Sequence, residues 1–67
     1  MEWQVHIHSD PKICMGKPVI KGTRLSVDFL LGLFASGWTE KQVLDNYPGL
    51  SKGNIQAIFA YAKENYI

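Results

Sequence analysis

The chain has 67 residues, 46% of them apolar, and a formal net charge of +1. This length and composition indicate one small globular domain and exclude a disordered chain. So small a net charge does not by itself indicate a nucleic-acid partner.

The N-terminal part of the sequence has the features of short strands. Residues 3–8 alternate between apolar and polar side chains, with Trp3, Val5 and Ile7 on one face, which predicts a strand with one buried face. Residues 18–20 and 24–26 are predicted to form two further short strands of a hairpin. Gly22 lies at its turn, where a positive φ costs glycine little.

From residue 27 the apolar period becomes helical. A helix is expected over residues 27–36, with Ser26 as its N-cap and Gly37 just after its end. Its apolar positions follow the i, i+3, i+4, i+7 stripe of a helix buried on one side. These positions are Val27, Leu30, Leu31 and Phe34.

Two further helices are expected over residues 39–47 and 51–65, separated by a turn that contains Pro48 and Gly49. Thr39 and Gln42 fit a capping box, and Ser51 is a suitable N-cap. The last helix is expected to bury the stripe formed by Ile55, Ile58, Phe59 and Ala62, whereas Asn54, Gln56, Ala57 and Lys63 lie off it.

The predicted fold is therefore one α+β, mainly α domain over residues 1–67. Residues 1–26 form the β segment, with a strand and a hairpin, and residues 27–67 form a three-helix bundle. Two helices joined by a short turn at the end of such a bundle are the outline of a helix-turn-helix.

One segment carries a specific motif. Residues 16–27 fit the pattern G-x-P-x-I-x-G-T-R-(I/L)-x-V, and residues 13–62 as a whole resemble the domain-of-unknown-function 433 family. The matching positions are Gly16, Pro18, Ile20, Gly22, Thr23, Arg24, Leu25 and Val27, followed by Gly37, Tyr47, Pro48, Ala57, Ala60, Tyr61 and Ala62. The resemblance implies a homeodomain-like fold, and some members look like antitoxins paired with PIN-like ribonuclease toxins.

A helix-turn-helix makes residues 51–65 the recognition helix. Its first turns carry side chains able to contact base edges or phosphate, namely Ser51, Lys52, Asn54 and Gln56. The alternative is a solvated helix face with a serine cap. Residues 27–67 hold three basic and four acidic side chains, a net −1, which opposes DNA binding because neutralising phosphates dominates the affinity.

The basic residues of the N-terminal part could supply the positive charge that residues 27–67 lack. Residues 1–26 hold four basic and two acidic side chains, a net +2. Lys17 and Lys21 are candidate phosphate contacts if the hairpin lies beside the recognition helix or if the partner in a dimer supplies it. Arg24 is expected to be structural instead, with its guanidinium binding a carboxylate such as that of Asp28 or capping backbone carbonyls.

Several large apolar side chains exceed what one small core needs. A homodimer interface, or a groove for a toxin, would bury them. The alternative is that the N-terminal strands cover them. These residues are Trp3, Phe29, Leu33 and Trp38.

Other kinds of chemistry have weak support. His6 and His8, with Asp10 and Cys14 nearby, match no standard zinc spacing, so no metal or cofactor is expected. The sequence has no nucleophile motif and no phosphate-binding P-loop, so an enzyme is not expected. No apolar run approaches the roughly 20 residues of a membrane span, and a lone cysteine favours the cytoplasm.

The sequence thus predicts a DNA-binding antitoxin or autorepressor that acts as a homodimer. The alternative is a protein-interaction module of the same shape that does not bind DNA.

Overall fold

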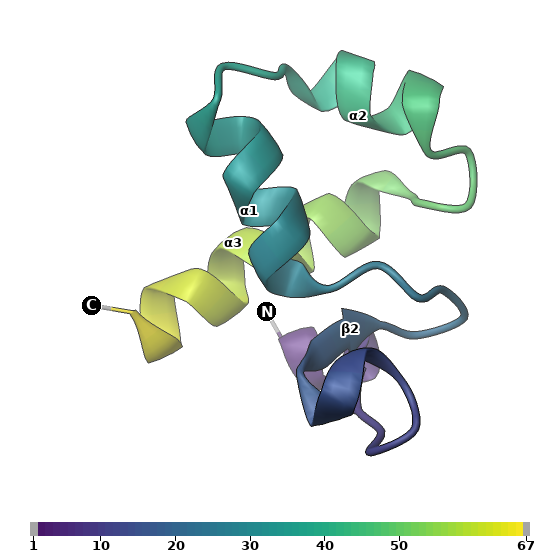
Figure 1. Cartoon of the computed structure of the whole chain (residues 1–67). Coiled ribbons are helices and arrows are strands. Elements are labelled where there is room, and N and C mark those ends of the chain that lie inside the picture. The colour runs from purple at the N-terminus through teal and green to yellow at the C-terminus, as the bar shows by residue number, and fades with distance from the viewer. Residues whose placement is uncertain (1, 67) are drawn as a thin grey trace.

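The computed structural model describes residues 2–66 and places a short N-terminal β segment beside three helices (Figure 1). In this view α1 crosses in front of α3, α2 lies above α3, and the β segment lies below it. This arrangement confirms the α+β, mainly α fold. In chain order the elements are η1 (Trp3–Val5), β1 (Ile7–Ser9), η2 (Cys14–Gly16), β2 (Pro18–Ile20), α1 (Val27–Ala35), α2 (Glu40–Asn46) and α3 (Lys52–Asn65).

The predicted strand over residues 3–8 is wrong for its first half. Trp3–Val5 is a turn of 3-10 helix, and Val5 is 61% exposed instead of buried. The reason is a contact distant in sequence: the Trp3 ring meets Tyr61 of α3 edge to face, with centroids 4.9 Å apart, and its indole N–H donates to Glu64. Docking this ring on α3 turns the chain before β1 begins.

β1 and β2 form the antiparallel two-strand hairpin, with Ile7 opposite Ile20 and Ser9 opposite Pro18. Strand 18–20 is confirmed, but residues 24–26 form no strand and contribute a single bridge, between Ser26 and Val19. The Thr23 hydroxyl donates to the Ile20 carbonyl and accepts the Leu25 N–H, which closes the turn. The chain then enters α1 at once, so a longer strand cannot form.

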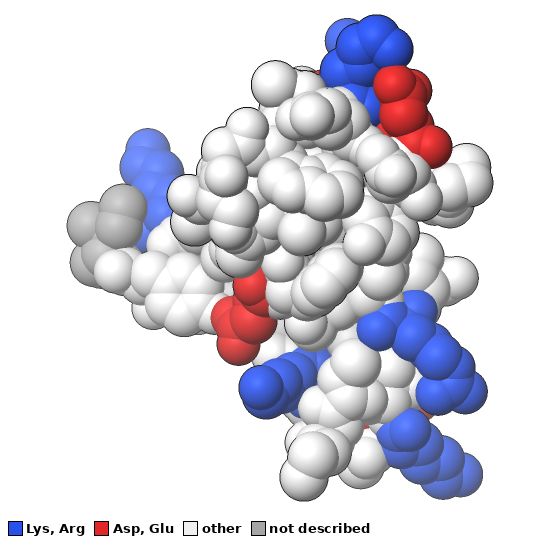
Figure 2. Space-filling view, turned by 45° about the horizontal axis from the view of Figure 1, so that its top comes forward, with Lys and Arg blue, Asp and Glu red and all other residues white. Residues whose placement is uncertain are grey.

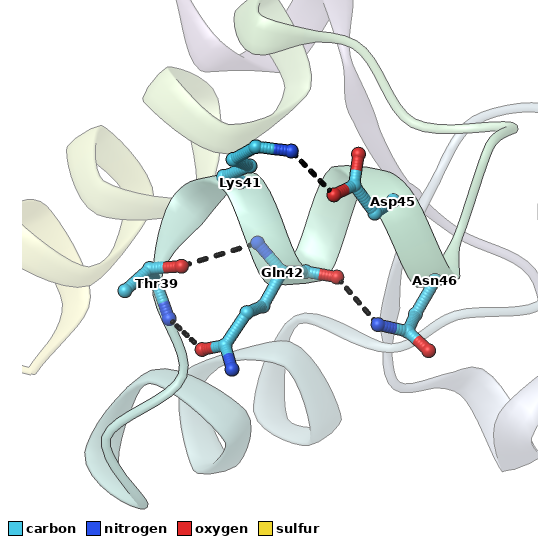
Figure 3. Close-up of polar contacts among 5 residues, drawn as sticks. All are labelled: Thr39, Lys41, Gln42, Asp45 and Asn46. Carbon is cyan, nitrogen blue, oxygen red and sulfur yellow. Dashed lines mark hydrogen bonds and ion pairs between the residues drawn. The ribbon is translucent and has the colours of Figure 1, made fainter.

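The three helices begin where their capping residues predicted. Ser26 Oγ accepts the Phe29 N–H at 3.0 Å, and Gly37 after α1 has a φ of +98°. Thr39 and Gln42 form the expected capping box, which Figure 3 shows beside the Lys41–Asp45 ion pair of 2.8 Å. This pair lies on the exposed surface of α2, and its hydrogen bond raises the pKa of Lys41.

The core lies where α1, α3 and β2 meet. Leu30 and Ile58 are fully buried, and Val43 of α2 joins them. Two assignments on α3 were wrong, because Ala57 is fully buried and Phe59 is 47% exposed. A single stripe fails here because α3 packs against the N-terminal segment as well as against α1.

The C-terminal end of α3 is fastened to α1. The Tyr66 hydroxyl donates to Asp28 at 2.6 Å, and this hydrogen bond raises the pKa of Tyr66 to about 12. None of the helices within residues 2–66 has both the length and the apolar character to cross a membrane.

Candidate nucleic-acid interface

The outer face of α3 carries one continuous exposed stripe. Spacings of four, three and four residues place its members on the same side of the helix. The stripe contains two lysines and no carboxylate. Its members are Lys52, Gln56, Phe59 and Lys63.

No acidic residue lies on the stripe itself, although Glu40 and Asp45 of α2 lie close to Lys52 at its start. Asp45 is paired with Lys41 on α2, Asp28 accepts the Tyr66 hydroxyl, and Glu64 accepts the Trp3 indole N–H. The net charge of −1 over residues 27–67 is therefore a poor guide to this face, which is basic although the segment is not.

A shallow depression of 360 Å³ adjoins the start of the stripe. It lies between α2 and α3, and its lining mixes two acidic and two basic side chains around a leucine, so its charge does not favour a polyanion. Lys52 forms one edge of it. The lining residues are Glu40, Lys41, Leu44, Asp45 and Lys52.

Asn54 does not lie on the stripe with Lys52 and Gln56. Its side-chain oxygen accepts the Ser51 N–H at 2.9 Å, and its own N–H donates toward the Ser51 hydroxyl at 3.1 Å. The side-chain NH₂ donates to His6 Nδ1 at 3.1 Å. Asn54 and Ser51 thus cap α3, and the Asn54 amide is occupied within the chain.

We expect Asn54→Ala to lower the free energy of unfolding by about 1–2 kcal/mol, because it removes the side-chain bond to the Ser51 N–H in the capping box and the bond to His6. Gln56→Ala is the matched control, since it removes an exposed amide two residues along the same helix and should cost less than about 0.5 kcal/mol. Urea unfolding of both variants measures this. Equal losses would contradict a structural role for Asn54.

The loop over residues 21–24 lies against the start of α3. Lys21 N–H donates to the His6 carbonyl at 2.9 Å, and the ring of His6 packs on Gly53 so closely that a Cβ there would be 3.2 Å from His6 Cε1. The Thr23 methyl lies 4.0 Å from the corresponding Cβ position of Gly49, in the turn before α3. The structure thus places Lys21 near this turn.

Lys17 is at the other end of β2. It precedes Pro18, which pairs with Ser9, whereas Lys21 follows Ile20, which pairs with Ile7. Of the two predicted phosphate contacts, only Lys21 is brought to the start of α3.

The expected structural pairing of Arg24 is wrong. Asp28 bonds to Tyr66 instead, and within residues 2–66 the Arg24 guanidinium has neither an ion pair nor a hydrogen bond. Its backbone carbonyl accepts a hydrogen bond from the Cys14 thiol at 3.2 Å. Figure 2 shows basic side chains gathered at the lower end of the molecule, where Figure 1 places β2.

The four predicted interface residues differ in how much they expose. Trp3, Leu33 and Trp38 are half-buried and pack against the core of their own chain. Phe29 on α1 is 45% exposed, with Tyr47 edge to face at 5.9 Å. α1 lies toward the viewer in Figure 1, and Figure 2 shows a broad uncharged surface below the charged group at the top of the molecule.

His6 is engaged by α3. In the part of the chain that the structure describes, no three His, Cys, Asp or Glu side chains are grouped to hold an ion. His6 instead accepts the bond from Asn54.

Lys63 and Phe59 are the residues of the stripe that the sequence-based reasoning missed. The apolar stripe predicted from the sequence includes Phe59 as a core residue and leaves Lys63 off it. Counting forward from Lys52 in steps of four, three and four would have found both.

The fold defines a class of small, mainly α domains in which a two-stranded sheet is packed on a three-helix unit. The model of the family described as protein of unknown function (DUF433) matches residues 7–62, so the chain belongs to the DUF433 family. Among curated proteins, none matches this chain.

A solved structure supports this assignment. The crystal structure of a DUF433 member protein from Anabaena variabilis ATCC 29413 is 34% identical in sequence and superposes with a TM-score of 0.88. The similarity covers 92% of this chain but 61% of that one, so the present chain spans less than two thirds of the length of this relative.

Proposed function

We propose that this protein is a DNA-binding module in which α2 and α3 act as a helix-turn-helix and α3 enters the major groove. The observation that carries the proposal is the exposed stripe of α3, which presents Lys52, Gln56 and Lys63 with no carboxylate among them. Lysines bind phosphate or guanine, and glutamine pairs with adenine.

The loop with Lys21 and Arg24 adds to this surface. It packs through Thr23 and His6 against the turn and first residues of α3, and both basic side chains are exposed. Contacts to the phosphate backbone on one side of the groove would fix the register of α3 without reading sequence. Lys17 is left outside this surface because it lies at the far end of β2.

Salt dependence of binding to a short random-sequence duplex tests the proposal. With three to four phosphate contacts, the logarithm of the binding constant should fall with the logarithm of salt concentration with a slope of about −3 to −4. Lys52→Gln should make this slope shallower by about 1. Lys41→Gln is the control, because that lysine is paired with Asp45 and should leave the slope unchanged. Absence of binding at about 25 mM salt would reject DNA binding.

A second candidate is a protein-interaction module that does not bind DNA. The ring of Phe29 on α1, which is 45% exposed, favours it. A second copy of the chain, or a PIN-like ribonuclease toxin as the family resemblance implies, would cover this ring. The two functions are compatible in an antitoxin, and the salt titration decides whether DNA binding is one of them.

A further inference from the structure

Phe59 is an apolar side chain in the middle of the otherwise polar stripe of α3. It is 47% exposed, and its neighbours on the same face, Gln56 and Lys63, are exposed too. About half of the surface of this residue therefore remains available to a partner.

The ring is also held in place. Phe34 of α1 packs against it with ring centroids 5.0 Å apart and an angle of 54° between the planes. A ring supported on one side and open on the other is pre-organised for contact, because little rotamer freedom remains to be lost on binding.

The charges around Phe59 indicate the partner. Lys52 and Lys63 flank it along the helix, and the stripe of α3 itself holds no carboxylate, although Glu40 and Asp45 of α2 lie near Lys52. A polyanion that also offers an apolar group fits this surface, and duplex DNA has one in the major groove, the C5-methyl group of thymine. Recognition helices of the homeodomain type read bases from positions three, four and seven residues apart, which is the spacing of Gln56, Phe59 and Lys63.

We propose that Phe59 reads thymine by packing its ring against the C5-methyl group. This inference rests on the proposed DNA-binding function and deepens it. Gln56, one turn earlier, is placed to pair with adenine, so the recognised sequence should contain A·T pairs within the reach of one helical turn of α3.

The experiment begins with enrichment of bound duplexes from a random pool by the wild-type protein and by Phe59→Ala. The enriched thymines are then replaced one at a time by deoxyuridine, which removes only the methyl group. At one position the replacement should weaken wild-type binding about fourfold, the effect expected for one buried methyl group. The same replacement should not change the affinity of the Phe59→Ala variant for the duplex.

Phe59→Leu keeps an apolar contact and should therefore retain part of the preference for thymine. The helical signal in the circular dichroism of each variant checks that the variant folds. An equal effect of deoxyuridine on the wild type and on Phe59→Ala would overturn the inference. So would an effect of Phe59→Ala on self-association alone. Salt-dependent binding without any deoxyuridine effect rejects only the role of Phe59, whereas absence of binding rejects the proposed function as well.

Discussion

Replacing Leu30 with alanine is expected to lower the free energy of unfolding by about 2–5 kcal/mol. Leu30 is fully buried at the centre of the core, in one cluster with Ile55 and Ile58 of α3. A chain of 67 residues has a total stability of roughly 3–10 kcal/mol. The cavity therefore removes a large part of the stability, and a measurable fraction of the variant should be unfolded without denaturant.

Urea unfolding followed by tryptophan fluorescence and by circular dichroism measures this loss. Val5→Ala is the control, because Val5 is 61% exposed and its truncation should change the stability by less than about 0.5 kcal/mol. A loss below about 1 kcal/mol for Leu30→Ala would contradict a core centred on α1 and α3.

Helix starts were predictable because they depend on local chemistry. Ser26, Thr39 and Ser51 each accept a backbone N–H three residues later, which a short polar side chain does without help from the rest of the fold. The positive φ of Gly22 and Gly37 follows for the same reason, since only nearby backbone geometry requires it.

Contacts between distant segments could not be predicted in this way. The alternation of residues 3–8 fits a strand, but the docking of Trp3 on Tyr61, a contact across most of the chain, gives a 3-10 turn instead. The bond between Asn54 and His6 likewise joins α3 to the N-terminal segment, and it takes Asn54 away from the exposed face. Neither contact can be predicted from the residue pattern of a single segment.

The candidate site was only partly predictable, because summed charge hides which face carries it. Lys52 and Gln56 lie on the exposed stripe as residues of a recognition helix would. The overall −1 of residues 27–67 pointed against such a surface, yet Asp28 and Glu64 are held in hydrogen bonds away from it. Only the positions of the acidic and basic side chains in the structure show which face of α3 is positively charged.

The double substitution Lys21→Gln with Arg24→Gln is expected to weaken binding to duplex DNA by roughly 100-fold at about 50 mM salt and to make the salt slope shallower by about 2. The reason is position: the loop that carries both side chains packs against the turn and first residues of α3, and the Arg24 guanidinium has no partner within residues 2–66. When a phosphate contact is lost, the counterions condensed on that phosphate stay on the DNA, and the free energy of their release no longer favours binding.

Lys12→Gln with Lys17→Gln is the matched control for this prediction. Both pairs remove two positive charges from the same N-terminal segment and change the net charge from +1 to −1. Lys12 and Lys17 lie in the connection between the end of β1 and the start of β2, at the opposite end of the sheet from Lys21. If the charges act only through the net charge of the molecule, both double variants will lose the same affinity. A loss confined to the variant of Lys21 and Arg24 would instead place this loop on the DNA, because the two variants differ in where the charge was removed and not in how much.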